Sequence, residues 1–430
     1  MGNYLYITTK IYESGIQTLV NIMKKQLMSI IIVSMFLGVT LQGMITTIAS
    51  AETTPGREDT QQRLSDIFLN TYIRILLRIA HKPSLAACII HGDEMVWSHA
   101  YGYYDRENKK KATTQTLYLQ ASVSKTVTAT ALMQLYEQGL FDLDDDVNDY
   151  LPFSLRNPNH PDIPITIRMI LSHRSSLADD NLYWICLSYL PGDPDVEGFP
   201  YPWLEEYLTP GGSAYSSTTW SREKPGEAYY YANIGFSIVA YLVEILSHQD
   251  FNVYCQQHIF QPLQMNCTGF RLRDVNIEDV AVPYEFKNNG YFRHPQYGIH
   301  VLYPAITLRT SIEDYSHFII AHMNGGVWNG IRILNQSTVE MMHTAHFSPS
   351  DKYNYGLGWQ VTNKVFQKTY GHSGGYVGAL DLITICPKDN TAVLLFSNAL
   401  DSELHSTRTE WKAFNAINKA LFHKAKRIAS

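Results

Sequence analysis

Strand-like segments lie at both ends of this chain, and helical segments lie between them. Near the start, two apolar runs, 86–90 and 94–103, flank a short turn that contains glycine, which is typical of a β-hairpin. Near the end, four strand-like runs follow one another, three of them spaced like an antiparallel meander: 356–361, 366–370, 379–386 and 391–397. This arrangement predicts one antiparallel sheet that is built from both ends of the chain.

The middle of the chain, about 140–335, has the pattern of helical segments separated by long loops. The longest loop, 179–225, is rich in Gly, Pro, Ser and Trp, and such length is typical of a functional lid or a binding loop. We therefore predict an α+β fold, in which the sheet from both chain ends is flanked by helices and carries an inserted, mostly helical subdomain. The domain would span 60–424, with a cleft between the sheet and the insertion.

Four segments have the apolar spacing of helices: 60–80, 122–139, 231–247 and 402–424. The first turns of segment 122–139 are rich in Val and Thr, which are weak helix formers, so we expect this helix to be buried and held by packing. Gly139 suits its C-terminal cap. Residues 52–60 are polar and predict a loose arm.

Composition narrows the classes of function. The formal net charge of -6 argues against a general nucleic-acid binder, and 45% hydrophobic residues are enough for a large core. None of the five cysteines forms a Cys-x-x-Cys pair, which argues against a zinc ribbon or a thioredoxin motif. Cys88 and Cys386 lie in strand-like runs and are expected to be buried. Whether Cys255 pairs with Cys267 stays open, because sequence alone cannot show it.

The N-terminus has the pattern of an export signal. Lys24 and Lys25 precede an uncharged stretch, 27–41, and a small-x-small site ends at Ala51. A basic segment, a short apolar core and an Ala-x-Ala end predict a signal peptide over 1–51 that is cleaved after Ala51.

Two alternatives concern this segment. Met23 suits a start codon better than Met1, which would make 1–22 an extension. The uncharged stretch also continues over 27–49, long enough to span a bilayer, so an uncleaved inner-membrane anchor is the alternative to cleavage. We expect an exported protein, periplasmic or secreted, or, in the alternative, one that the segment 27–49 anchors in the inner membrane. Contact with the membrane is expected only through this segment, if it is retained.

The sharpest chemical signal is Ser122-Val123-Ser124-Lys125. A serine hydroxyl is a poor nucleophile at neutral pH and needs a base. A lysine three residues later on a helix lies on the same face, one turn away. The helix N-terminus adds partial positive charge, which favours a developing alkoxide and oxyanion. Ser122 and Lys125 are therefore the candidate nucleophile and its partner.

A second element, Tyr231-Ala232-Asn233, opens another predicted helix. A tyrosine near a lysine ammonium can have its pKa lowered and can relay a proton to a leaving group. Asn233 offers a donor and an acceptor for a substrate amide. The three consecutive tyrosines, 229–231, also fit an aromatic packing strip.

The third element is Gly371-His372-Ser373-Gly374-Gly375, at a strand edge. Glycines there let a substrate approach the backbone closely, and the Gly375 N–H is a candidate to form an oxyanion hole with the Ser122 N–H. The same run matches Gly-x-Ser-x-Gly, the nucleophile elbow of α/β-hydrolases, with Ser373 as the nucleophile. That elbow needs a helix after it, and the next run, 379–386, is strand-like, so we reject this interpretation.

In this order the three elements resemble the serine β-lactamase and penicillin-binding-protein superfamily, whose pattern is Ser-x-x-Lys, Tyr-x-Asn and His-x-Gly. The class C β-lactamase-related serine hydrolases, which include D-stereospecific peptidases and esterases, are the most similar branch. The resemblance covers about 64–397, and its supporting phrases are Gln120-Ala121-Ser122, 139–144, 170–177 and Pro225-Gly226-Glu227. It implies a β-lactamase/transpeptidase-like fold.

The resemblance also implies a role for each matching residue. Ser122 would be the acylated nucleophile, and Lys125 its general base or electrostatic partner. Tyr231 would deprotonate Ser122 or, later, the deacylating water. The backbone amides of Ser122 and Gly375 would form the oxyanion hole. Substrate contacts would come from Asn233, His372, Ser373 and Gly374.

Two positions depart from the pattern of the penicillin-recognising members. His372 stands where they usually carry a lysine, and Ser373 stands where they carry a threonine. Lysine is a permanent cation that suits a substrate carboxylate, whereas histidine is mostly neutral near pH 7. This departure favours esters or D-amino-acid amides over penicillin-type substrates.

We therefore predict a serine hydrolase that acts through an acyl-enzyme on Ser122 and cleaves an ester, a D-amino-acid amide or peptide, or a β-lactam. Its partner would be this small-molecule or peptide substrate, and we expect no cofactor, metal or nucleic acid. The alternative is a catalytically silent cell-wall peptide-binding protein of the same fold. The presence of Ser122, Lys125 and Tyr231 together argues against it, because a binder does not need all three.

Overall fold

The structure is a computed structural model that describes residues 57–179, 190–192, 202–299, 301–347, 354–364, 367–401 and 409–428. The chain divides into two compact units, Met1–Phe68 and Leu69–Ser430. The described part of the first unit is the beginning of α2 (Arg57–Ile79), as far as Phe68. The predicted signal peptide and its anchor alternative lie outside the described residues. In the described ranges, no helix combines the length and apolar character that a bilayer crossing requires.

An eight-stranded antiparallel sheet organises the second unit, in the order β12-β13-β14-β15-β16-β1-β2-β3. Strand β1 pairs with β16, so the two chain ends meet in the middle of the sheet, and the predicted fold class is confirmed. The N-terminal strands are β1 (Ser84–His91), β2 (Glu94–Asp105) and β3 (Lys110–Lys111). The C-terminal strands are β12 (Asn354–Tyr355), β13 (Gln360–Lys364), β14 (Gln367–Tyr376), β15 (Ala379–Cys386) and β16 (Thr391–Ser397).

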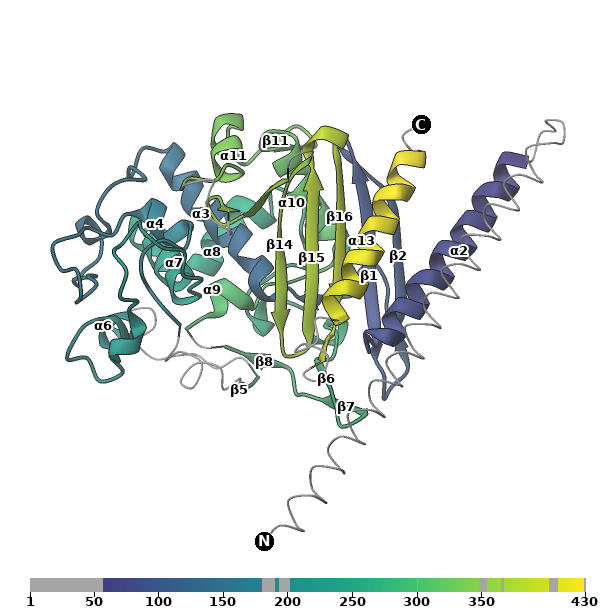
Figure 1. The fold of residues 1–430 in the computed structure, drawn as a ribbon, viewed down its shortest axis with the longest axis horizontal. Coiled ribbons are helices and arrows are strands. Elements are labelled where there is room, and N and C mark those ends of the chain that lie inside the picture. Colours follow the sequence, from purple (N-terminus) through teal and green to yellow (C-terminus); the bar gives the residue numbers. More distant parts are fainter. Residues whose placement is uncertain are drawn as a thin grey trace, which may run out of the picture. The chain divides into compact units, whose positions relative to one another are not determined.

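The central strands are apolar almost without interruption because both faces of the sheet are covered. Along β1, Ala86, Cys88 and Ile90 belong to one core cluster, whereas the alternate residues Leu85, Ala87 and Ile89 belong to another. This alternation is the two-residue period of a strand. Helix α10 (Ile312–Met323) contributes to the first cluster and α13 (Thr409–Ile428) to the second, so the two helices lie on opposite faces. Figure 1 shows α13 crossing the sheet.

The other helices come from the segment between the two halves of the sheet (Figure 1). They are α3 (Ser124–Glu137), α4 (Ile167–Leu171), α6 (Trp203–Leu208), α7 (Ile234–Ser247), α8 (Phe251–Cys255), α9 (Tyr303–Ile306) and α11 (Gln336–Met342). Short strands pair among them: β4 (Tyr118–Leu119) with β9 (Arg309–Thr310), β5 (Leu190–Pro191) with β8 (Tyr297–Gly298), and β10 (Val327–Trp328) with β11 (Ile331–Arg332). A three-stranded sheet holds β6 (Tyr284–Lys287), β7 (Gly290–Arg293) and β17 (Ala399–Asp401).

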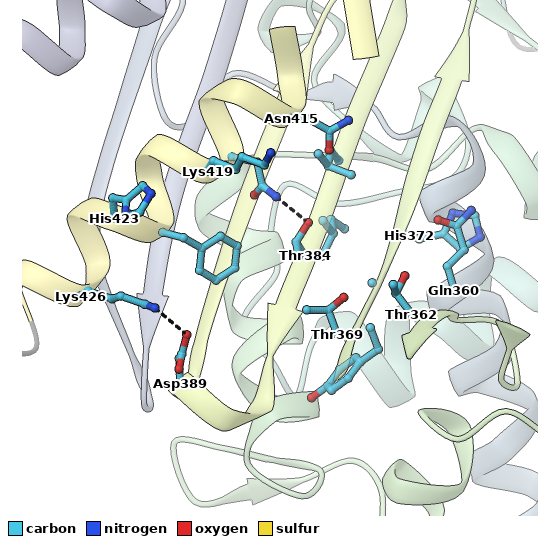
Figure 2. Close-up of a pocket in the computed structure, with 16 residues that line it drawn as sticks. Gln360, Thr362, Thr369, His372, Thr384, Asp389, Asn415, Lys419, His423 and Lys426 are labelled. Atoms are coloured by element: carbon cyan, nitrogen blue, oxygen red, sulfur yellow. Dashed lines mark hydrogen bonds and ion pairs between the residues drawn. The ribbon is translucent and has the colours of Figure 1, made fainter. Parts of the chain in front are cut away.

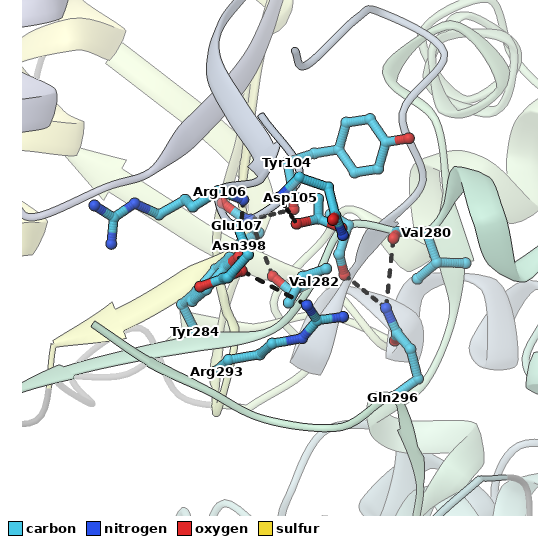
Figure 3. A network of polar contacts seen from close by, with 12 residues as sticks. Tyr104, Asp105, Arg106, Glu107, Val280, Val282, Tyr284, Arg293, Gln296 and Asn398 are labelled. Carbon is cyan, nitrogen blue, oxygen red and sulfur yellow. Dashed lines mark hydrogen bonds and ion pairs between the residues drawn. The ribbon is translucent and has the colours of Figure 1, made fainter. Parts of the chain in front are cut away.

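A polar network ties this small sheet to the β2–β3 turn of the large one (Figure 3). The Tyr284 hydroxyl accepts the Arg106 backbone N–H at 2.9 Å and also bonds to Glu107. The Asn398 amide donates to the backbone oxygens of Tyr104, at 3.1 Å, and Val282, at 3.0 Å. The inserted segment is therefore fixed to the sheet by hydrogen bonds as well as by apolar packing.

Some predicted boundaries differ from the structure. The predicted helix 122–139 begins as a separate 3-10 turn, η1 (Ala121–Val123), before α3 starts, so Ser122 belongs to the turn. The predicted arm 52–60 is wrong from Arg57 on, where α2 begins. Segment 179–225 is not one loop, because it holds α6 and a 3-10 turn at Ser217–Thr219.

Two further differences bear on the site. Helix α7 begins at Ile234, so Tyr231 and Asn233 precede it rather than lie within it. Strand β14 extends to Tyr376, well past the predicted 366–370, so the glycine-rich run lies within a strand. A strand, β15, follows it, which agrees with the rejection of Ser373 as an elbow nucleophile.

Four of the five cysteines lie in the described part of the chain. Cys255 is buried and Cys267 is exposed, and both are free, so this possible pair is not formed. Cys88 and Cys386 are buried, as predicted.

Candidate active site

Ser122 lies in the middle of η1, immediately before α3. The residue before it, Ala121, has a φ of +44°, in the left-handed region that costs a non-glycine residue about 1–2 kcal/mol. Strand β14 lies against this turn: a Cβ built on Gly374 would stand 2.5 Å from the Gln120 carbonyl oxygen and 3.2 Å from the Ala121 Cβ. The packing of a glycine against η1 thus helps to hold the strained turn that presents the Ser122 hydroxyl.

Lys125 is fully buried in the first turn of α3. Its Nζ lies 3.1 Å from Ser122 Oγ, 2.7 Å from Asn233 Oδ1 and 3.0 Å from the Ala305 carbonyl oxygen. Burial lowers the pKa of Lys125 to about 7, because the ammonium loses its water, and the nearby Asp179 carboxylate opposes this fall.

The three oxygens around Lys125 can accept from all three protons of an ammonium, and they are equally compatible with a neutral amine. A neutral amine has two N–H donors and one lone pair, whereas an ammonium has three donors and no lone pair. Asn233 Oδ1 and the Ala305 carbonyl can only accept, so in the neutral form they use the two donors. The lone pair is then left for Ser122, whose hydroxyl can donate to it.

Tyr231 completes the surroundings of Ser122. Its ring centroid lies 4.9 Å from Lys125 Nζ. Burial raises the pKa of Tyr231, and a hydrogen bond with the Ser122 side chain opposes this only in part. The prediction of a lowered pKa for this tyrosine is therefore wrong, because the cost of removing a phenolate from water exceeds the benefit of its neighbours. The residue is a phenol, which is a proton donor.

Asn233 is held by Asp179, a residue that the sequence reasoning missed. The Asp179 carboxylate accepts from Asn233 N at 2.6 Å, from Asn233 Nδ2 at 2.6 Å and from Ile234 N at 3.3 Å, at the start of α7. No spacing in the sequence links residue 179 to residue 233. The only signal was its position, two residues after the Leu177 that ends a family-like phrase.

His173 fixes the backbone around Tyr231. It has a φ of +58°, and its carbonyl accepts from Tyr230 N at 2.9 Å. Its Nδ1 accepts from Ala232 N at 3.2 Å, and its ring lies 4.3 Å, between centroids, from the Tyr231 ring. His173 thus positions the Tyr231-Ala232-Asn233 element through backbone and ring contacts.

His372 is buried, and both of its ring nitrogens are engaged within the protein. Nδ1 donates to the Ser373 carbonyl at 2.7 Å, so Nε2 accepts from the Tyr355 hydroxyl at 2.6 Å. Burial, with a smaller contribution from the nearby Lys125, lowers the pKa of His372 to about 3. The ring is therefore neutral, and a substrate contact at this position would fall to the backbone of β14.

The remaining predicted residues follow His372 on β14. Ser373 donates to Gln360 Oε1 from its backbone N, at 3.2 Å, and from its hydroxyl, at 3.3 Å. Gly374 is buried against η1, and Gly375 is exposed. The structure therefore brings Ser122, Lys125, Tyr231 and Asn233 into direct contact and sets β14 beside them.

A separate groove of about 430 Å³ lies on the α13 side of the sheet, lined by β13, β14, β15 and α13 (Figure 2). Polar contacts lie along it: Asn418 Nδ2 donates to Thr384 Oγ1 at 3.1 Å, and Lys426 Nζ lies 3.7 Å from Asp389 Oδ2. Ser122 and Lys125 do not line it.

Comparison with known proteins identifies the family of this chain. The family model described as Beta-lactamase matches residues 69–416, most of the chain. The chain belongs to this family. The predicted superfamily of serine β-lactamases and penicillin-binding proteins is thereby confirmed.

Among curated relatives, Protein flp of Staphylococcus aureus (strain MW2) is 24% identical over 352 residues, which are 80% of this chain and 64% of flp. The chain thus spans less than two thirds of that relative. Among solved structures, the octameric penicillin-binding protein homologue from Pyrococcus abyssi matches with a TM-score of 0.66 and 25% identity, over 77% of this chain and 73% of that one.

A second solved structure shares the Beta-lactamase fold. The D-amino acid amidase from Ochrobactrum anthropi SV3, complexed with L-phenylalanine amide, has a TM-score of 0.65 and 20% identity. The match covers 83% of this chain and 99% of the amidase. This chain therefore shares its fold with a penicillin-binding protein homologue and with a D-amino acid amidase.

Proposed function

We propose that this chain is a serine hydrolase that acts through an acyl-enzyme on Ser122. One observation carries the proposal: Lys125 Nζ lies 3.1 Å from Ser122 Oγ while two backbone or side-chain carbonyls occupy its donors. A buried amine with a pKa of about 7 is a base matched to neutral pH, and bases of this kind activate serine nucleophiles.

In the proposed acylation step, Ser122 Oγ attacks the substrate carbonyl carbon and its proton passes to Lys125 Nζ. The oxyanion that forms is held by the backbone N–H groups of Ser122 and Gly375. Tyr231, as a phenol, donates its proton to the departing oxygen or nitrogen. The Lys125 ammonium, whose Nζ lies 4.9 Å from the Tyr231 ring centroid, then returns a proton to the phenolate. The products are an acyl ester on Ser122 and the free alcohol or amine.

Deacylation follows the same path with water in place of the serine. A water attacks the ester carbonyl, its proton passes to the neutral amine of Lys125, and Ser122 Oγ leaves with a proton. Asn233 binds the substrate amide in both steps. Asp179 uses one proton of the Asn233 Nδ2 and Lys125 uses one lone pair of the Asn233 Oδ1, so the other proton and the other lone pair are available to the substrate.

The substrate class that we favour is an ester or a D-amino-acid amide or peptide. His372 supports this choice, because a buried neutral ring offers no cation for the carboxylate of a penicillin-type substrate. The protein of similar fold named as a D-amino acid amidase also supports an amide substrate. β-Lactams are the third candidate class, and the substrate panel includes them.

Labelling with a fluorophosphonate probe tests the nucleophile. We expect the wild-type chain and Ser373→Ala to be labelled and Ser122→Ala not to be. Lys125→Arg should label at least about a hundredfold more slowly, because a guanidinium retains the charge and donors of a lysine but has no lone pair at neutral pH. Labelling of Ser122→Ala, or loss of labelling only in Ser373→Ala, rejects the assignment.

A substrate panel separates turnover from binding. Nitrocefin, p-nitrophenyl esters, D-amino-acid amides and D-Ala-D-Ala peptides are offered to the purified protein and to Ser122→Ala as its matched control. Hydrolysis that requires Ser122 identifies the substrate class. Absence of turnover and of labelling, together with measurable peptidoglycan binding, would instead favour the cell-wall peptide-binding alternative.

We also propose that the chain is exported through residues 1–51. The support is the basic, apolar and Ala-x-Ala order of that segment. Intact mass of the protein from its native host should correspond to a chain that begins at Glu52. Retention of 27–49 in that mass would instead identify a membrane anchor.

A further inference from the structure

The Asp179 carboxylate sits at the beginning of α7 and receives three N–H groups from two successive residues. Its Oδ2 accepts from both the backbone N and the side-chain Nδ2 of Asn233, and its Oδ1 accepts from Ile234 N. A helix N-terminus presents unpaired N–H groups and partial positive charge, both of which suit an anion. Asp179 comes from a segment more than fifty residues earlier, so the contact is a tertiary one.

We propose that Asp179 is a positioning residue for this site: it locks the Asn233 side chain with its oxygen toward Lys125, and its negative charge attracts the lysine when the amine is protonated. The inference rests on the proposed function, because it deepens the account of the same site. Asp179 acts on Ser122 through Asn233 and Lys125 rather than by direct contact.

The orientation of the Asn233 amide follows from its two neighbours. Its Nδ2 faces the Asp179 carboxylate at 2.6 Å, and its Oδ1 faces Lys125 Nζ at 2.7 Å. A flipped amide would set oxygen against carboxylate oxygen and would leave the lysine without this acceptor. Because a carboxylate can only accept, it admits one of the two orientations. Loss of the carboxylate would remove that restriction.

The charge of Asp179 acts on a buried amine with few other charged neighbours. Among the residues that the structure describes, the titratable groups that face Lys125 are Asp179, Tyr231, His173 and His372. The two histidines are neutral near pH 7, because burial and Lys125 itself lower the pKa of each. The tyrosine is a phenol. Asp179 is thus the only anion in this set, and it raises the pKa of Lys125 against the larger effect of burial.

Direct titration of the lysine tests the proposal without any substrate. The protein is labelled with [13Cε]lysine, and the Lys125 signal is identified by its loss in Lys125→Ala. In Asp179→Asn we expect the Lys125 pKa to fall relative to the wild type by about 0.5 units or more, because an attractive charge is removed. In Asp179→Glu, which retains the charge, it should return toward the wild-type value.

A matched control comes from a second carboxylate that caps a helix elsewhere. Asp250 accepts from Asn252 N at 2.9 Å and from Val253 N at 3.2 Å at the start of α8. Asp250→Asn makes the same chemical change away from Lys125, so the Lys125 titration should not move. If Asp179→Asn does not fold, Asp179→Ser, which keeps a capping oxygen without charge, replaces it. An unchanged Lys125 pKa in the uncharged variant overturns the proposal.

The pH dependence of kcat/KM in the Asp179 variants provides a second test of the proposal. Deprotonated Lys125 is the active form, so a lower pKa in Asp179→Asn should move the acidic limb of the kcat/KM profile to lower pH. The plateau should fall about tenfold or more as Asn233 loses its orientation, and Asp179→Glu should recover part of it. If the wild type neither labels nor hydrolyses, the proposed function fails, yet the titration still decides whether Asp179 sets the state of Lys125.

Discussion

Gly374 lies so close to the turn that carries Ser122 that a methyl group on it would stand 2.5 Å from the Gln120 carbonyl oxygen. The obstacle is backbone, which cannot move aside without displacing η1. The same methyl group would lie 3.3 Å from Asp381 Oδ2, on the neighbouring strand β15. The strained turn and strand β14 therefore fit together only while residue 374 has no side chain.

We expect Gly374→Ala to lower the labelling rate at Ser122 by about a hundredfold, since a displacement of about 1 Å in a catalytic group has effects of that order. The melting temperature should also fall, because overpacking costs about 1–3 kcal/mol. Gly290→Ala is the matched control, since a methyl group there has only an ordinary contact, 3.9 Å from the Lys287 carbonyl oxygen. A Gly374→Ala protein that labels at the wild-type rate would show that η1 does not depend on this contact.

Replacement of Tyr231 by Phe should separate two kinds of substrate. An amide nitrogen must be protonated to leave, whereas p-nitrophenolate leaves as an anion, so we expect kcat/KM to fall by about 10²–10⁴-fold on amides and by less than about tenfold on p-nitrophenyl esters. Tyr230→Phe removes a neighbouring hydroxyl that donates to Glu223 at 2.7 Å, and should change neither rate appreciably. Equal losses on both substrates would assign Tyr231 to activation of Ser122 instead.

The strands in the sheet centre could be predicted almost to the residue, because their apolar content records burial on both faces. Strands β15 and β16 begin and end where the sequence pattern placed them. Ser122 and Lys125 could be predicted for a related reason: a spacing of three residues has a fixed geometric meaning along one turn. Both are local features, and local features can be recognised in a single sequence.

Asp179 and Tyr355 could not be found in this way, because each meets its partner across a tertiary contact that has no period in the sequence. The pKa of Tyr231 was predicted with the wrong sign for a similar reason. Proximity to a lysine lowers a tyrosine pKa and burial raises it, and only the structure shows that burial is the larger effect here. The glycine-rich strand was cut short because glycine usually weakens a strand, whereas here Gly371 and Gly374 permit close backbone contact on either side.

The pH dependence of activity should report Lys125. As a base it acts only when deprotonated, so kcat/KM for a p-nitrophenyl ester should rise with pH through about 7 and level off above it. The rise reflects the free enzyme, because kcat/KM titrates groups before substrate binds. A profile that stays flat from about pH 5.5 to about pH 8.5 would exclude a base with the properties of Lys125.

Acid stability should depend on His322, which is buried between Phe318 and Trp359 and lies 3.1 Å, through Nε2, from Thr130 Oγ1. Burial lowers its pKa from 6.5 to about 3. Between these values the unfolded chain binds a proton at this site that the folded chain does not, so the free energy of unfolding falls as the pH falls. Between pH 6.5 and pH 5, one such group lowers the free energy of unfolding by about 2 kcal/mol.

His322→Gln removes this titration. The stability deficit of this variant relative to the wild type, measured by urea unfolding, should therefore shrink by about that amount between pH 6.5 and pH 5. The exposed His423, changed to Gln, should leave the curve parallel to the wild type, and a constant deficit in His322→Gln would mean that the buried ring is not the proton-linked group.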